Sequence, residues 1–205
     1  MGRKAAKRRE RKEAAKQSAR LDAVVPRSAQ GGDRAPAGSL HEAVHALAAA
    51  VLMGADQIAN VTVAPGPGLP GGSLELVDDP ELSAAGAAET PLEELPAMLV
   101  ERARARMVMH LAGTFDGDVA GARSTGQAHA YASDRSNALE LALLLADWDE
   151  AGTAAILATA EEQARTVVRE HQPEIRAVAD QLDLRGTLTG PDVAEILAGL
   201  GGRSP

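Results

Sequence analysis

The sequence predicts a mainly α-helical domain with one small β-hairpin, preceded by a disordered basic tail. The chain has 205 residues, of which 45% are hydrophobic, so it can bury a sizeable core in one domain. Its aromatic residues are Trp148, Phe115 and Tyr131. The core must therefore be built from Ala, Leu, Val, Ile and Met, which favours closely packed helices over a β-sandwich.

Residues 1–37 form the predicted tail, and residues 38–205 form the domain. Residues 1–20 contain nine Lys or Arg and two Glu, a net charge of +7, which leaves −15 of the chain's total of −8 for the rest. No apolar repeat follows this basic run, so we expect disorder. A basic tail suits contact with nucleic acid or an anionic membrane surface, but the favoured interpretation is a solubilising or weakly helical tail with no dedicated partner.

The chain contains no cysteine, which excludes disulfides and thiolate ligands. Any metal must then be held by His and carboxylate side chains. No apolar stretch follows the basic run as it does in a secretory signal, and no segment approaches the ~20 apolar residues of a membrane helix. We expect a cytoplasmic protein without an integral membrane segment.

The first half of the domain contains one predicted helix and the hairpin. Apolar residues at helical spacing predict a helix over Ser39–Met53 that ends at Gly54. Alternating residues predict two short antiparallel strands, Val61–Val63 and Ser73–Val77. The acidic, Ala-rich segment Asp78–Glu89 should be a loop.

The second half should be a series of helices. Helical periodicity, Ser or Thr caps and the positions of Pro and Gly predict the boundaries. The predicted helices are Pro96–Ala112, one from the Ser133 cap to Leu145, Thr153–Glu170, Pro173–Leu182 and a short one after the Thr189 cap.

The candidate site is the segment His41-Glu42-Ala43-Val44-His45 in the first helix. Residues i and i+4 lie on one helix face, so His41 and His45 can present two imidazole nitrogens to one metal ion. Glu42 beside them is suited to accept a proton from water, the arrangement of a hydrolytic zinc site. A structural role also fits, because Ser39 and Glu42 have the spacing of a helix capping box.

Several short motifs resemble, in the same order, the protease domain of the FtsH-type membrane-anchored AAA+ zinc proteases. The resemblance extends over about residues 38–198. The segments and the family motifs that they resemble are His41–Leu47 (HEAGHAL), Asn60–Gly66 (KVTIIPRG), Leu111–Gly113 (LGG), Ser124–Gly126 (TTG or STG), Ala132–Ala138 (ASNDLERA) and Leu188–Val193 (TLDGEEV).

The resemblance implies a zinc metallopeptidase that cleaves unfolded or flexible polypeptide substrates. It implies that Zn²⁺ is held by His41, His45 and Asp134, and that Glu42 is the catalytic base. From the residues alone, Asp116, Asp118 or His129 remain alternatives for the third ligand. Asp134 would then be a first-turn carboxylate favoured by the helix dipole.

Two departures from the family pattern affect the expected activity. Val44 stands where the family has glycine, and its branched side chain could crowd the metal, so a catalytically weak or inactive binding or regulatory module is the alternative function. The chain also lacks the P-loop sequence G-x-x-x-x-G-K-[ST]. We therefore expect cleavage to be ATP-independent on its own, with a separate ATPase or a homo-oligomer as open partners.

Overall fold

The computed structural model describes residues 37–63, 72–88, 90–120 and 128–201. The predicted tail, except for its last residue, and the Ser124–Gly126 motif lie outside the described residues. The elements, in chain order, are α2 (Ala37–Leu52), η1 (Ala55–Gln57), β1 (Ile58–Thr62), β2 (Ser73–Leu76), α3 (Pro80–Ala88), η2 (Leu92–Glu94), α4 (Ala97–Gly113), α5 (Asp116–Ala120), α6 (Ala128–Leu145), α7 (Glu150–Glu170), α8 (Gln172–Arg185), β3 (Thr187–Thr189) and α9 (Gly190–Gly201).

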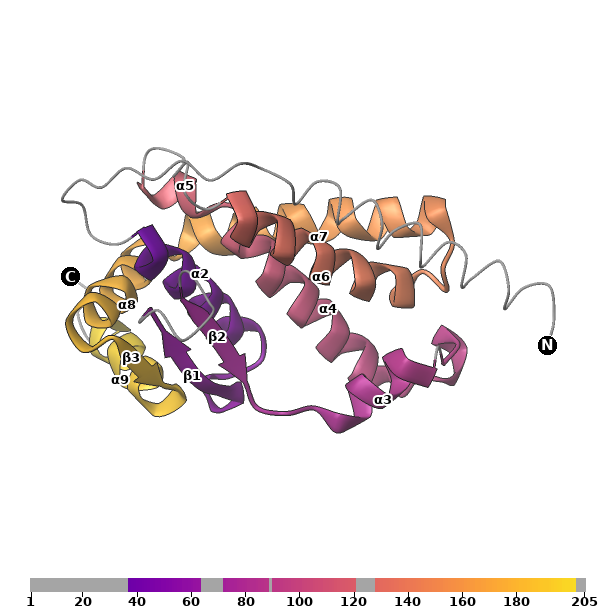
Figure 1. Ribbon diagram of the computed structural model, residues 1–205, viewed down its shortest axis with the longest axis horizontal. Coiled ribbons are helices and arrows are strands. Elements are labelled where there is room, and N and C mark those ends of the chain that lie inside the picture. Colours follow the sequence, from indigo (N-terminus) through magenta and orange to yellow (C-terminus); the bar gives the residue numbers. More distant parts are fainter. Residues whose placement is uncertain (1–36, 64–71, 89, 121–127, 202–205) are drawn as a thin grey trace.

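Helix α2 lies at the centre of the fold (Figure 1). It packs against α4 and α8 and contacts the sheet through β1 and β2. The residues from Ala43 to Ala49, apart from His45, are apolar and at most 1% exposed. Four of these are Ala, whose small side chain lets neighbouring elements approach the helix on every side. The part of α2 that carries the motif is therefore surrounded by protein, whereas Val51 and Leu52 at its end are exposed. The mainly α-helical prediction is confirmed.

The predicted hairpin is present, but it belongs to a three-stranded antiparallel sheet with the order β2-β1-β3. Strands β1 and β2 pair from Thr62 and Ser73 to Ile58 and Leu76, with one irregularity in β1. Strand β3, which was not predicted, pairs with the other edge of β1. Its central residue Leu188 is fully buried between two exposed threonines. Strand β2 is consequently an edge strand.

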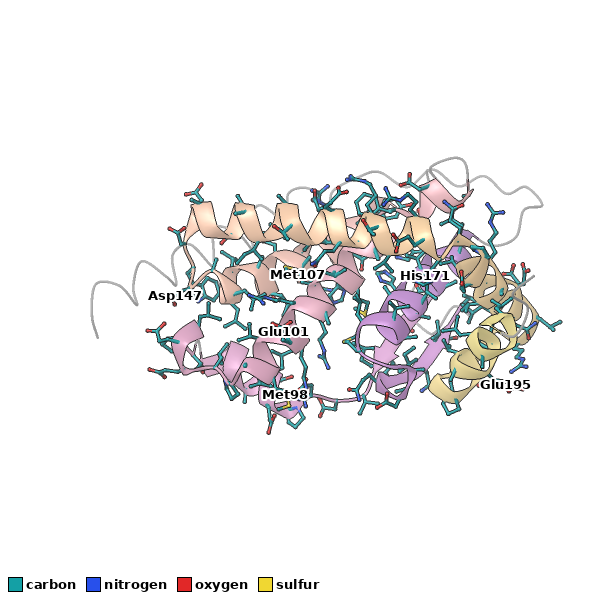
Figure 2. All side chains as sticks on the ribbon, turned by 180° about the vertical axis from the view of Figure 1, so that it is seen from behind. Met98, Glu101, Met107, Asp147, His171 and Glu195 are labelled. Atoms are coloured by element: carbon teal, nitrogen blue, oxygen red, sulfur yellow. The ribbon has the colours of Figure 1, made fainter. Side chains whose placement is uncertain are left out.

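Three long helices complete the core on the side of α2 away from α8. Helix α4 packs against α6 and α7 as well as α2. The apolar repeat of the sequence predicts an inner face of Leu95, Leu99, Ala103, Met107 and Leu111. The last four are buried on α4, whereas Leu95 lies before the helix and is half-buried. Seen from behind, α7 runs along the molecule from the turn at Asp147 to His171 (Figure 2). Among the described helices, none combines the length and the apolar character needed to cross a membrane.

Three helices begin earlier in the chain than predicted. Helix α2 begins before Ser39, whose hydroxyl donates to Asp183 of α8, so the predicted capping box is wrong. Helix α7 is capped by Asp149, which accepts from the backbone N–H of Gly152, whereas Thr153 lies inside the helix. Helix α6 begins at Ala128, about one and a half turns before Ser133.

The segment predicted to be a loop contains helix α3. The buried carboxylate of Asp79 accepts a hydrogen bond from the backbone N–H of Leu82 and so caps this helix. It also lies 3.4 Å from the guanidinium of Arg102 on α4. These two contacts anchor the start of α3 to the core, which explains why a polar, Ala-rich sequence is helical here.

Candidate metal centre

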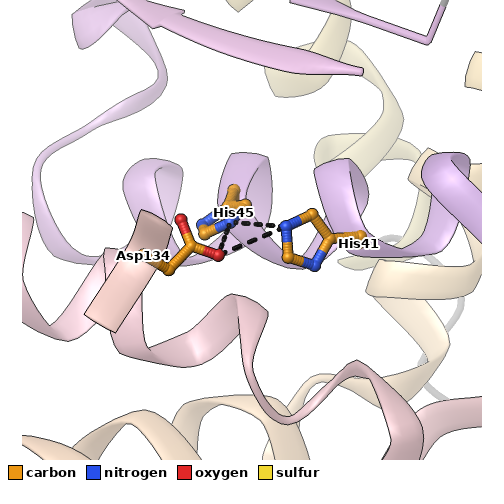
Figure 3. A group of neighbouring side chains, drawn as sticks. All are labelled: His41, His45 and Asp134. Atoms are coloured by element: carbon orange, nitrogen blue, oxygen red, sulfur yellow. Dashed lines mark hydrogen bonds and ion pairs between the residues drawn. The ribbon is translucent and has the colours of Figure 1, made fainter. Parts of the chain in front are cut away.

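Two helices bring together the three predicted ligands. Helix α2 carries His41 and His45 one turn apart, and α6 carries Asp134 in its interior. All three residues are buried, with 4%, 5% and 8% of their surface exposed. Figure 3 shows the two imidazoles and the carboxylate pointing toward one another. Because Asp134 lies within α6 rather than in its first turn, the alternative role at a helix N-terminus is wrong.

The three candidate ligand atoms form a nearly equilateral triangle. His45 Nε2 lies 3.2 Å from His41 Nε2 and 3.2 Å from Asp134 Oδ2, and His41 Nε2 lies 3.3 Å from the same oxygen. A tetrahedral ion with bonds of ~2.0–2.1 Å separates its ligand atoms by about 3.3 Å. The group is thus spaced so that it could hold one small metal ion on three protein atoms.

The hydrogen bonds behind the imidazoles assign their tautomers. His45 Nδ1 lies 3.0 Å from the carbonyl oxygen of Met109, and His41 Nδ1 lies 3.1 Å from that of Gly113. A carbonyl oxygen only accepts, so each Nδ1 must carry the proton that it donates. Both Nε2 lone pairs then point at the Asp134 carboxylate, and two lone pairs and an anion at these distances repel unless a positive charge lies among them.

The pKa values of His41 and Asp134 reflect the same need for a positive charge among the three ligand atoms. Burial by itself would lower the pKa of His41, but hydrogen bonds to Asp116 and Asp134 outweigh it and raise the pKa to about 10. Burial would raise the pKa of Asp134, but His45, His110 and His41 together hold it well below its usual value. A proton on His41 thus supplies the positive charge at neutral pH, and a bound metal ion would take its place.

Glu42 belongs to the same buried cluster and is 6% exposed. Burial raises the pKa of its carboxyl group, while the charges of His45 and His41 act in the opposite direction. The main chain of Gly72, directly before β2, lies against its side chain: a Cβ built on Gly72 would come within 2.2 Å of Glu42 Cγ. Since the capping box is absent, Glu42 has no role in starting the helix. Its side chain lies near His41 and His45 and next to the start of the edge strand β2.

Neither of the two alternative aspartates joins the triangle. Asp116 is buried, but its Oδ2 lies 3.4 Å from Nδ1 of His41, the side of the ring that faces away from the triangle. Asp118 is exposed on the short helix α5. His129 lies in α6, and its side chain is outside the described part of the chain. Val44 is completely buried in the hydrophobic core, and the three ligand atoms meet despite its branched side chain.

Other residues of the site were not predicted to have a role there. In the sequence, Gly113 was singled out only as part of the Leu111–Gly113 motif. In the structure its backbone packs against the site so closely that a Cβ on it would lie 2.3 Å from Nε2 of His45. His110 Nδ1 lies 3.7 Å from the second carboxylate oxygen of Asp134, and burial lowers the pKa of His110. No sequence pattern marks the carbonyls of Met109 and Gly113, because every residue has one.

Protein-family models and curated proteins provide no relative of this chain. No protein-family model matches this chain, and no curated protein matches it either. The resemblance to FtsH-type proteases therefore stays a prediction that rests on the short motifs, and the function must be argued from the site itself.

Proposed function

We propose that this protein is a zinc-dependent endopeptidase that cleaves unfolded or flexible polypeptides without ATP. The observation that carries the proposal is the triangle of His41 Nε2, His45 Nε2 and Asp134 Oδ2, with both Nδ1 atoms donating to backbone carbonyls. When a metal ion replaces the proton on His41, the three atoms become acceptors that face one point, as metal ligands must.

The donor set favours zinc over the harder divalent ions. Two imidazole nitrogens and one carboxylate oxygen suit Zn²⁺, whereas Mg²⁺ and Ca²⁺ prefer oxygen ligands. Three protein ligands also leave a coordination position open, as catalytic zinc sites do. Bound zinc would polarise a carbonyl and lower the pKa of water toward ~7.

Glu42 is the proposed proton acceptor. Its carboxylate lies in the same buried cluster as His41 and His45 and has no capping role. In peptide hydrolysis it would accept the proton of the attacking water and pass it to the leaving amine. Burial of Glu42 keeps bulk solvent away from this transfer.

The edge of β2 is the proposed binding site for the substrate backbone. Within the described residues, no strand pairs with the outer edge of β2. The strand starts at Ser73, next to Gly72 and hence next to Glu42. An extended peptide that adds to this edge would be led to the proton acceptor, and it would be recognised by its main chain more than by its sequence. Folded substrates do not offer such a segment without local unfolding.

The proposal predicts metal-dependent turnover of an unstructured polypeptide such as casein. Chelation should abolish cleavage, stoichiometric zinc should restore it, and addition of ATP should have no effect. His45→Ala should bind no zinc and cleave nothing, because two ligands cannot hold the ion. Zinc binding by the wild-type protein without any turnover would instead support the inactive binding module, and turnover that survives chelation would contradict the zinc site.

Gly72→Ala tests the role of the edge strand. The new Cβ would meet Glu42 Cγ at 2.2 Å and the carbonyl oxygen of Thr62 at 2.5 Å, so the strand start or the carboxylate must move. Because a shift of ~1 Å in a catalytic group can lower the rate about 100-fold, we expect a large loss of kcat/KM with zinc affinity preserved. Unchanged turnover of the variant would place the substrate elsewhere.

A further inference from the structure

The imidazole of His41 has a second acceptor behind it. Its Nδ1 lies 3.1 Å from the carbonyl oxygen of Gly113 and 3.4 Å from Oδ2 of Asp116. Asp116 is 3% exposed and begins the short helix α5. A buried carboxylate on the far side of a metal-binding imidazole holds the ring in one tautomer and makes its other nitrogen a stronger donor to the metal.

The carboxylate of Asp116 is itself held in place. The hydroxyl of Tyr131 donates to Asp116 Oδ1 over 2.5 Å, so that the two carboxylate oxygens have separate partners. The Tyr131 ring also lies against His41, with ring centroids 5.6 Å apart. Tyr131 precedes Asp134 by three residues on α6, which puts both on one helix face. Within one turn of α6, Asp134 therefore contacts Nε2 of His41 directly, and Tyr131 reaches the Nδ1 side of the same ring through Asp116.

We propose that Asp116 and Tyr131 are positioning residues for the metal centre. The inference rests on the proposed zinc function and extends it to two residues outside the ligand set. Nδ1–H of His41 donates to the carbonyl oxygen of Gly113, and the Asp116 carboxylate lies 3.4 Å from the same nitrogen as its charged partner. The hydroxyl of Tyr131 holds that carboxylate in place. Both imidazoles have a backbone carbonyl at Nδ1, Gly113 for His41 and Met109 for His45, but among the described residues the structure places a carboxylate at this nitrogen only for His41.

Zinc affinity of the purified full chain, measured by competition with a chelator, tests this inference. Asp116→Asn keeps the shape but removes the charge, and Tyr131→Phe removes only the hydroxyl. Each should weaken zinc binding about 10- to 100-fold, the usual effect of losing such a partner. Asp118→Asn, an exposed change on the same short helix, is the matched control and should bind zinc like the wild type.

A second readout separates positioning from general destabilisation. With Co²⁺ in place of zinc, the visible absorption of both variants should shift, because the spectrum reports the ligand field and not the fold. Wild-type affinity and an unchanged cobalt spectrum in both variants would overturn the inference, as would loss of affinity explained wholly by unfolding of both metal-free variants in circular dichroism. Wild-type protein that binds zinc but cleaves nothing would overturn the proposed function alone; wild-type protein that binds no zinc would overturn both.

Discussion

Gly113→Ala should abolish zinc binding while leaving the fold intact. A Cβ at this position would lie 2.3 Å from Nε2 and 2.4 Å from Cε1 of His45, and 3.0 Å from Cε1 of His41. The rings cannot withdraw without breaking the triangle, since each Nδ1 is held by a backbone carbonyl. The chain itself should tolerate alanine, because Gly113 lies in the last turn of α4 and alanine favours helix. We expect at least a ~100-fold loss of zinc affinity, consistent with misplacing two ligands, and a parallel loss of turnover.

Gly199→Ala is the matched control for this substitution. Gly199 also lies in a helix, α9, and a Cβ there would meet nothing within 4 Å. The control should keep zinc affinity and turnover, and its unfolding free energy should rise by about 0.5–1 kcal/mol. A Gly113→Ala variant with the zinc stoichiometry and affinity of the wild type would show that the imidazoles do not pack against α4 as described.

Local periodicity was sufficient to predict the long helices and the hairpin. In α4 the residues Leu99, Ala103, Met107 and Leu111 recur at helical spacing, and all four are buried. The hairpin was predicted from alternation in two short segments. These signals are reliable because one face of each element must pack on the core, which imposes its period on the sequence. Strand β3 escaped prediction because only one residue of its three, Leu188, faces inward.

Helix starts were harder to predict because a Ser or Thr hydroxyl can bond to a partner other than the backbone N–H groups of the next turn, whether near or far in sequence. Ser39 has the composition and spacing of a cap, but its hydroxyl bonds to Asp183, 144 residues away. Thr153 donates to the carbonyl oxygen of Asp149 from within α7. A capping rule considers only the next few residues, so it cannot distinguish a cap from a tertiary contact.

In the candidate site, too, some residues can be predicted from neighbouring sequence and others depend on contacts between distant segments. His41 and His45 follow from the i, i+4 geometry of one helix. Asp134 lies 89 residues beyond His45 and was selected by resemblance, with Asp116 among the open alternatives. Only the structure distinguishes the two aspartates: Asp134 meets the Nε2 atoms and Asp116 meets the opposite nitrogen of one ring. Composition and spacing could not show which nitrogen each carboxylate faces.

Glu42→Gln should retain zinc and lose turnover, which is the sharpest test of the catalytic assignment. Glutamine has nearly the same shape but cannot accept the proton of the attacking water, and loss of a general base costs ~10²–10⁴ in kcat. The ligand atoms of His41, His45 and Asp134 are untouched, and the buried position accepts a neutral side chain readily because burial already disfavours the charge. Zinc content, cobalt absorption and casein cleavage are the measurements.

Glu93→Gln provides the control, since Glu93 is an exposed carboxylate on η2 and lies outside the cluster. It should match the wild type in every measurement. The two variants of the candidate site then separate the proposed metal-binding and proton-accepting roles, because Gly113→Ala should lose metal and turnover together, whereas Glu42→Gln should lose turnover alone. Equal cleavage by Glu42→Gln and wild-type protein would remove Glu42 from the mechanism, and loss of zinc from this variant would mean that its carboxylate contributes to holding the metal.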